Sequence, residues 1–160
     1  MKTLASITIL GMILQFVVVP LHPEIDQKPQ VPATQSTKAP GYEQFLAALA
    51  QVESRGDDRA VGDNGQALGR YQIHQAYWKD AVSFDASIGG SYKDVTDPTY
   101  AGRVVSAYFR RYGKSYLENS DWESLARLHN GGPGIFKRKA SKAWENTSKY
   151  WSRVKAALHD

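Results

Sequence analysis

The sequence contains no cysteine. That absence excludes a disulfide framework, a metal site built on thiolates and a cysteine nucleophile. The four histidines have none of the spacings typical of metal ligands, and no glycine-rich segment matches a P-loop or a dinucleotide-binding fingerprint. No serine lies in a nucleophile elbow. We therefore predict neither a metal nor a cofactor, and carboxylates remain as the candidate catalytic groups.

The sequence also lacks a strong excess of either charge. Its 160 residues carry 20 Lys and Arg against 16 Asp and Glu, and 42% of them are hydrophobic. This composition is typical of one globular domain, so wholesale disorder is excluded. Seven cations lie close together near the C-terminus: Lys137, Arg138, Lys139, Lys142, Lys149, Arg153 and Lys155. They indicate either a solvated helix face or attraction to an anionic polymer, and without a recognition motif a cell wall is favoured over a nucleic acid.

Long hydrophobic runs are absent apart from one near the N-terminus, from Leu4 to Val19. It is shorter than the roughly 20 residues of a spanning helix and is typical of a signal-peptide core. No clear small-x-small cleavage site follows, so the alternative is an anchor that tethers the chain to a membrane through residues 4–19. We predict a leader at 1–22, a proline-rich tether at 23–40 and a monomeric folded domain at 41–160. The protein is then exported, to be periplasmic, membrane-anchored or secreted.

Hydrophobic periodicity predicts a helix over 43–54, ended by Arg55-Gly56. The tripeptide Asp63-Asn64-Gly65 is a strong hairpin signal and predicts strands near 60–62 and 66–72. A short helix over 75–82 and a loop over 83–96 follow.

Helices fill the C-terminal half of the expected domain. Asp97-Pro98 opens a helix that Gly113 ends, and Ser120 with Glu123 forms a capping box for the next. A last helix covers 143–158, with Trp144, Trp151, Val154 and Leu158 facing inward. Together, the predicted helices and strands indicate an α+β fold that is mostly helical and has one small β-hairpin.

Glu53 is the carboxylate that the residues themselves favour as a general acid. It borders the apolar stripe of the helix over 43–54 and lies in its last turn. Partial burial and the carbonyl end of the helix both disfavour a negative charge there, so we expect a raised pKa and a carboxyl that stays protonated near neutral pH. The alternative is a solvated glutamate at the end of a surface helix.

Asp63 is a second candidate, because the hairpin turn that holds it can fold back over the end of that helix. Asp is also a common turn residue that bonds its own backbone, which is the alternative for this position. Asp57 and Asp58 lie in the connecting loop and are expected to be solvated. Two carboxylates, one in an apolar and one in a wet setting, are the arrangement that glycoside hydrolysis uses.

The segment Asn130-Gly131-Gly132-Pro133 ends a helix. Two successive glycines allow the backbone to approach something closely, which is either another helix or a sugar.

Several of these segments together resemble the lysozyme superfamily, most closely the invertebrate-type (destabilase) lysozymes and their bacterial homologues. The matching pieces are Val52-Glu53-Ser54, Gly69-Arg70-Tyr71-Gln72-Ile73, Ala76-Tyr77-Trp78-Lys79-Asp80, Ala126-Arg127-Leu128-His129-Asn130-Gly131-Gly132-Pro133 and Lys149-Tyr150-Trp151. They occur in the family's order and cover most of residues 45–155. Animal members are rich in disulfides and this chain has none, which points to a bacterial branch.

The resemblance implies a lysozyme-like fold with a cleft between the helical part and the hairpin. It implies that Glu53 is the general acid and that Asp63 is the nearest match to the second carboxylate. It also implies that Gln72, Tyr77, His129 and Asn130 line or brace the cleft and bind substrate.

The expected activity is hydrolysis of the β-1,4 bond between N-acetylmuramic acid and N-acetylglucosamine in peptidoglycan. The first alternative is a lytic transglycosylase, because the Glu-Ser and Gln-Ile pieces fit that class as well and it needs Glu53 alone. The second is a non-catalytic wall-binding module on a tether.

Overall fold

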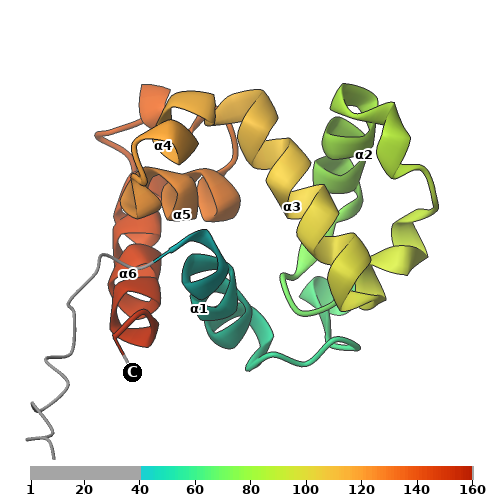
Figure 1. Cartoon of the computed structure of the whole chain (residues 1–160). Coiled ribbons are helices and arrows are strands. Elements are labelled where there is room, and N and C mark those ends of the chain that lie inside the picture. Colours follow the sequence, from blue (N-terminus) through green and yellow to red (C-terminus); the bar gives the residue numbers. More distant parts are fainter. Residues whose placement is uncertain (1–40, 160) are drawn as a thin grey trace, which may run out of the picture. The chain divides into compact units, whose positions relative to one another are not determined.

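A computed structural model describes residues 41–159 (Figure 1). The leader, the tether and the anchor predicted from the sequence lie outside the described residues. Within them the chain forms six α-helices and one small antiparallel sheet of three strands. The expected class, mostly helical with a small sheet, is confirmed. In the same part of the chain, no helix has both the length and the apolar content needed to cross a bilayer.

Helix α1 spans Tyr42–Ser54, as the periodicity predicts. Its apolar stripe is buried, with Phe45 and Leu49 fully inaccessible to solvent. Arg55 follows in the left-handed conformation (φ 59°), and the N–H of Gly56 then donates to the carbonyl of Ala50 at 3.1 Å. This turn ends the helix at Ser54 and leaves Glu53 in its last turn.

The predicted hairpin is present and is part of a larger sheet. Strands β1 (Val61–Gly62), β2 (Ala67–Leu68) and β3 (Ile73–His74) pair in that order, all antiparallel. The third strand was not expected. The predicted strand over 66–72 breaks after Leu68, because the backbone of Gly69 (φ 72°) and of Gln72 (φ 47°) is left-handed and reverses the chain. A 3-10 turn over Asp63–Gly65, η1, joins β1 to β2.

The middle of the domain follows its local signals. Helix α2 spans Gln75–Phe84, and two 3-10 turns, η2 (Ala86–Ile88) and η3 (Tyr92–Thr96), occupy the expected loop. Helix α3 spans Pro98–Tyr112 and ends at Gly113 as predicted. The Asp97 carboxylate accepts the N–H of Tyr100 at 2.7 Å and caps α3.

The C-terminal helices are α4 (Lys114–Glu118), α5 (Trp122–Gly131) and α6 (Lys142–Ala157), with a 3-10 turn η4 (Ile135–Lys137) before α6. Helix α4 was not expected. The predicted capping box is wrong in one residue, because Asp121 and not Ser120 caps α5, accepting the N–H of Ser124 at 3.0 Å. The buried line of α6 is Thr147, Tyr150 and Val154. Trp144, Trp151 and Leu158 are only partly buried.

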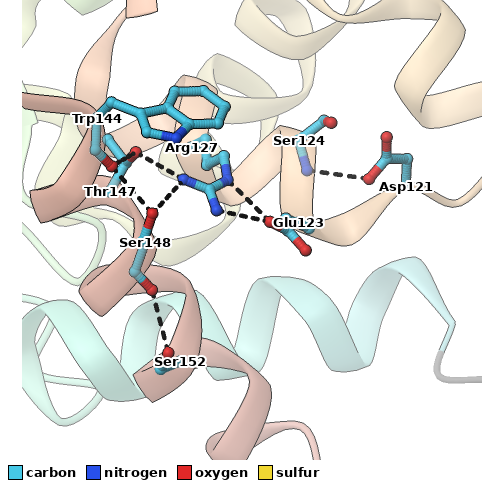
Figure 2. A network of polar contacts seen from close by, with 8 residues as sticks. All are labelled: Asp121, Glu123, Ser124, Arg127, Trp144, Thr147, Ser148 and Ser152. Atoms are coloured by element: carbon cyan, nitrogen blue, oxygen red, sulfur yellow. Dashed lines mark hydrogen bonds and ion pairs between the residues drawn. The ribbon is translucent and has the colours of Figure 1, made fainter. Parts of the chain in front are cut away.

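An arginine clamps α5 to α6 (Figure 2). Arg127 is 8% exposed. It donates to the Glu123 carboxylate at 2.7 Å on its own helix and to the hydroxyls of Thr147 (3.1 Å) and Ser148 (2.8 Å) on α6. Its guanidinium lies 4.2 Å from the centre of the Trp144 ring. The buried charge is thereby paired and hydrogen-bonded, and two helices that reach the candidate site are held together.

Candidate active site

A cleft of about 340 Å³ gathers residues from both halves of the domain. Its lining is Glu53, Asp63, Gln72, His74, Tyr77, His129 and Asn130. All six residues predicted from the sequence lie together here, although they come from α1, η1, the turn before β3, α2 and α5. His74 is the additional member. The chemical roles of these residues remain predictions at this point, because geometry alone does not test them.

Glu53 is poorly hydrated and firmly held. Its side chain is 18% exposed. The hydroxyl of Tyr150 donates to Oε1 at 2.7 Å, and Nε2 of His129 lies 3.5 Å from the same oxygen. Both of these contacts, from Tyr150 and His129, are made to Oε1 of Glu53. The second oxygen, Oε2, is therefore the one left for a ligand in the cleft.

The expected direction of the Glu53 pKa is wrong. Burial does raise this pKa, as the sequence indicates. The imidazole of His129, the hydroxyl of Tyr150 and the charge of Arg153 act the other way and more than offset burial, so the pKa lies below its ordinary value of 4.5. Hydrogen bonds and positive charge favour the carboxylate. In the free protein Glu53 is therefore ionised near neutral pH.

His129 connects Glu53 to α2. Its side chain is 4% exposed, with Nε2 3.1 Å from the carbonyl oxygen of Tyr71 and Nδ1 3.2 Å from the hydroxyl of Tyr77. Both neighbours of Nε2, a carbonyl and a carboxylate, are acceptors, so Nε2 carries hydrogen. Burial raises the pKa of Tyr77 well above its ordinary value, which keeps the hydroxyl protonated. The ring of Tyr77 stacks on the ring of Tyr108, with 3.6 Å between the two centroids, and so braces the imidazole of His129.

Asp63 has the contrasting environment. Its side chain is 68% exposed. Its Oδ2 lies 2.8 Å from Nε2 of His74, within hydrogen-bonding distance. The expected contrast in exposure between the two carboxylates is therefore present. The apolar setting expected for Glu53 is wrong, because polar groups of Tyr150 and His129 surround its Oε1. The two loop aspartates lie elsewhere: Asp57 accepts the N–H of Arg59 at 2.9 Å, and Asp58 pairs with Arg70 at 2.5 Å.

Sequence reasoning missed two residues at the site, His74 and Tyr150. His74 was considered only as a metal ligand. No local signal placed His74 beside Gln72, because the backbone turns at Gln72 (φ 47°) immediately before β3. Tyr150 lies 97 positions from Glu53. The segment Lys149-Tyr150-Trp151 indicated the resemblance to the family, but it did not indicate that Tyr150 contacts Glu53.

The first residue of the double glycine allows close packing between two helices. A Cβ at Gly131 would lie 2.7 Å from Ile135 and 2.8 Å from Thr147, so the end of α5 lies directly on α6. Of the two alternatives for this motif, close approach to another helix therefore applies to Gly131. Asn130 before it is exposed and lines the cleft.

The predicted basic cluster is solvent-facing. All seven of its members are exposed, on and after η4 and along α6: Lys137, Arg138, Lys139, Lys142, Lys149, Arg153 and Lys155. Lys142 pairs with Glu145 at 3.2 Å. In the described part of the chain, residues 41–159, no three His, Asp or Glu side chains gather as a metal site would require.

Comparison with known proteins gives consistent matches. The model of the Destabilase family matches residues 42–157. Lysozyme 1 of Crassostrea virginica is 34% identical over 119 residues, which cover 71% of this chain and 58% of that protein. Invertebrate-type lysozyme of Ruditapes philippinarum is 32% identical over 115 residues, covering 67% of this chain and 81% of that protein. The chain thus spans little more than half the length of the first of these relatives.

Proposed function

The chain belongs to the Destabilase family, and from that premise we propose that it is a lysozyme, a glycoside hydrolase that cleaves peptidoglycan. The bond cut is the β-1,4 link between N-acetylmuramic acid and N-acetylglucosamine, and Glu53 is the general acid. One observation carries the proposal: the buried Glu53 and the exposed Asp63 line one cleft, although they belong to different elements. Both relatives named above are lysozymes, which supports the same activity.

Glu53 donates its proton from Oε2 to the glycosidic oxygen, because Oε1 is held by Tyr150. The carboxylate is ionised in the free protein and has to gain this proton first. A glycan that fills the cleft displaces water from Glu53, and this further loss of hydration favours the neutral carboxyl. Acidic pH favours the same form. The protein is therefore expected to work best below neutrality.

Asp63 is placed to stabilise the positive charge that develops on the sugar, or to position the attacking water. Its side chain is 68% exposed and is therefore accessible to a ligand in the cleft. Gln72 is oriented by a bond from its Nε2 to the carbonyl of Gly69 at 3.0 Å. Asn130 offers a second carboxamide to the cleft. We assign substrate binding to these two amides, and bracing of the acid to Tyr77 and His129.

Replacement of the acid tests the proposal. Glu53→Gln is expected to lower the rate of cleavage of purified cell walls by about 10²–10⁴-fold, the usual contribution of positioned acid catalysis. The glutamine still accepts the hydroxyl of Tyr150, so the circular dichroism spectrum and thermal midpoint should stay close to those of the wild type. Retention of most activity by this variant would reject Glu53 as the acid.

A lytic transglycosylase is the second candidate, because that reaction needs one acid only, and the polar contacts that hold Glu53 come from Tyr150 and His129 and not from Asp63. Product analysis separates the two: a free reducing end indicates hydrolysis and a 1,6-anhydro end indicates transglycosylation. Near-normal activity of Asp63→Asn would also favour the transglycosylase. Binding to sacculi with no product from the wild type would identify a non-catalytic wall-binding module.

The partner and location follow from the same proposal. Peptidoglycan glycan strands are the partner, and the leader over 1–22 directs export, so that the protein is periplasmic, membrane-anchored or secreted. Recovery of the full chain from the cytosol alone would contradict this part.

A further inference from the structure

A groove along α3 has a volume of about 590 Å³, larger than that of the cleft. This volume is within the range of about 300–1,000 Å³ that is usual for small-molecule sites. Residues of α1, of η2 and of the turn before β3 complete the lining, and none of them lines the cleft. We call this separate space the α3 groove. Its residues on α3 itself are Pro98, Thr99, Gly102, Arg103, Ser106 and Arg110.

Three arginines line the α3 groove, and two of them are already neutralised by carboxylates of the protein. Nε of Arg70 lies 2.5 Å from Oδ1 of Asp58, and a guanidinium nitrogen of Arg110 lies 2.6 Å from Oδ2 of Asp85. These two pairs account for four of the charges in and beside the groove. The charges that remain for a ligand are those of the third arginine and of a glutamate on α1.

Arg103 and Glu43 are these two remaining charges. Arg103 is exposed, and one of its nitrogens donates to the carbonyl of Ser87 at 2.9 Å. Its guanidinium has five N–H donors, so donors remain for a ligand. Glu43 is also exposed, and in the described range 41–159 neither residue has an ion pair with another side chain. The α3 groove therefore offers one cation and one anion without a counter-charge.

The floor of the α3 groove is apolar. Leu46 and Ile88 line it although each is only 6% exposed, and Tyr71 lines it at 4%. Side chains that are almost buried and still reach a groove lie at its base. On the α3 wall, a Cβ added to Gly102 would have no heavy atom within 4 Å, so the space beside this residue is open. An apolar group of a ligand has room there and an apolar surface to cover.

We propose that the α3 groove binds a short peptide with a free amino end, a free carboxylate and an apolar side chain. The carboxylate pairs with Arg103, the ammonium group pairs with Glu43, and the apolar side chain lies on Leu46 and Ile88. A single anion would satisfy Arg103 alone and leave Glu43 without a partner. This inference goes beyond the proposed function, because it requires neither Glu53 nor a glycan.

Probes that differ only at their ends test the inference. The free tripeptide Gly-Leu-Gly, its N-acetyl derivative and its C-terminal amide are titrated into the full chain, and binding is followed by the NMR signals of backbone amides on α3. The free tripeptide should bind most tightly. Each blocked form should bind about 5- to 10-fold more weakly, because it has lost one charged partner in a partly exposed site.

Variants of the two charged residues assign each end of the peptide. Arg103→Gln should bind the free tripeptide and its amide with equal affinity, and should still disfavour the acetylated form. Glu43→Gln should show the opposite pattern. Arg59→Gln, which removes the charge of an exposed arginine outside the groove, should leave all three affinities unchanged.

A third variant fills the α3 groove without removing any charge. Gly102→Leu places a side chain in the open space, and leucine favours a helix more than glycine does, so α3 should be retained. This variant should lose binding of the free tripeptide. In the absence of peptide it should cleave cell walls at the rate of the wild type, since Gly102 does not line the cleft.

The outcomes distinguish this inference from the proposed function. The α3 groove is overturned as a peptide site if the wild type does not bind the free tripeptide, or binds the blocked forms equally well. Binding that persists in Gly102→Leu overturns it too. Failure of the wild type to cleave cell walls rejects the proposed function alone, because the peptide titrations do not depend on cleavage.

Discussion

At the scale of single residues, the hydroxyl of Tyr150 is one of the groups, after the imidazole of His129, that lower the pKa of Glu53. It donates to Oε1 at 2.7 Å and is almost fully buried. Burial and the adjacent carboxylate raise the pKa of Tyr150, so this hydroxyl remains a donor across the working range. A donor that stabilises the carboxylate lowers the pKa of Glu53. Tyr150 is therefore a positioning residue that acts through the acid.

We expect Tyr150→Phe to raise the pKa of Glu53. Activity that needs the protonated acid falls as pH rises through this pKa, so the alkaline limb of the pH–rate profile should move to higher pH. A carbon-13 titration of the Glu53 carboxyl should move in the same direction, and it can be measured without any substrate.

The control for this prediction is Tyr42→Phe. Tyr42 lies on the same helix as Glu53 and shares one hydrogen bond with Ser106 at 2.8 Å, away from the cleft. That variant loses a comparable bond and should leave the pH profile unchanged. An equal shift in both variants, or none in Tyr150→Phe, would show that Tyr150 has a structural role only.

Gly62 sets the position of Gln72. A Cβ at Gly62 would lie 2.0 Å from Oε1 of Gln72, although the backbone there (φ −119°) is open to any residue. We expect Gly62→Ala to push the amide from the cleft and lower activity about 10-fold, with little loss of stability. The double variant Gly62→Ala/Gln72→Ala should then be no worse than Gln72→Ala. Gly102→Ala, in open helical space, is the neutral control.

At the scale of secondary-structure elements, the pairing of α5 with α6 positions two groups on Glu53, because α5 carries His129 and α6 carries Tyr150. The Arg127 clamp holds these helices in register (Figure 2). We expect Arg127→Ala to lower the free energy of unfolding by about 2 kcal/mol and to lower activity further than this loss explains. Urea unfolding and wall-cleavage assays measure the two effects.

A second charge pair of the same spacing provides the control for the clamp. Lys114 and Glu118 lie four residues apart on α4, 3.7 Å between charges, with both side chains well exposed. Lys114→Ala should leave stability unchanged within error, because an exposed pair is screened by water and salt. Equal costs for the two substitutions would contradict the assignment of Arg127 as a clamp.

At the scale of the whole molecule, the domain has no disulfide and depends on its helical core. Most of the largest fully buried side chains come from four of the six helices, α1, α3, α5 and α6: Phe45, Leu49, Val104, Val105, Phe109, Leu125, Leu128, Tyr150 and Val154. Burial of this kind over about 120 residues is sufficient to stabilise a domain. The domain is therefore stabilised without covalent cross-links.

The charge of the whole molecule, +4, predicts a dependence on salt. If the seven exposed cations attract an anionic wall, cleavage of walls should fall several-fold as ionic strength rises past about 0.1 M, where the screening length is about 10 Å. Cleavage or binding of uncharged N-acetylglucosamine oligomers should not change over the same range. An equal fall for both substrates would locate the salt effect in the cleft.

Local structure was largely predictable from the sequence because its signals are local. Asp97-Pro98 and Gly113 bound α3, and Asp63-Asn64-Gly65 marks the turn between β1 and β2. Where the local signal was ambiguous, the prediction was incomplete. The third strand pairs through backbone that turns at Gly69 and Gln72, and the left-handed conformation of a glutamine leaves no mark in the sequence.

The sequence by itself determined the family, the order of the helices and the six residues expected to share a cleft. It could do so because caps, turns, periodicity and motifs depend on neighbours a few positions apart. Only the tertiary structure decided the charge of Glu53 and the addition of His74 to the cleft. Those depend on side chains from α5, α6 and the sheet that come within hydrogen-bonding distance after folding, and no local pattern encodes that distance.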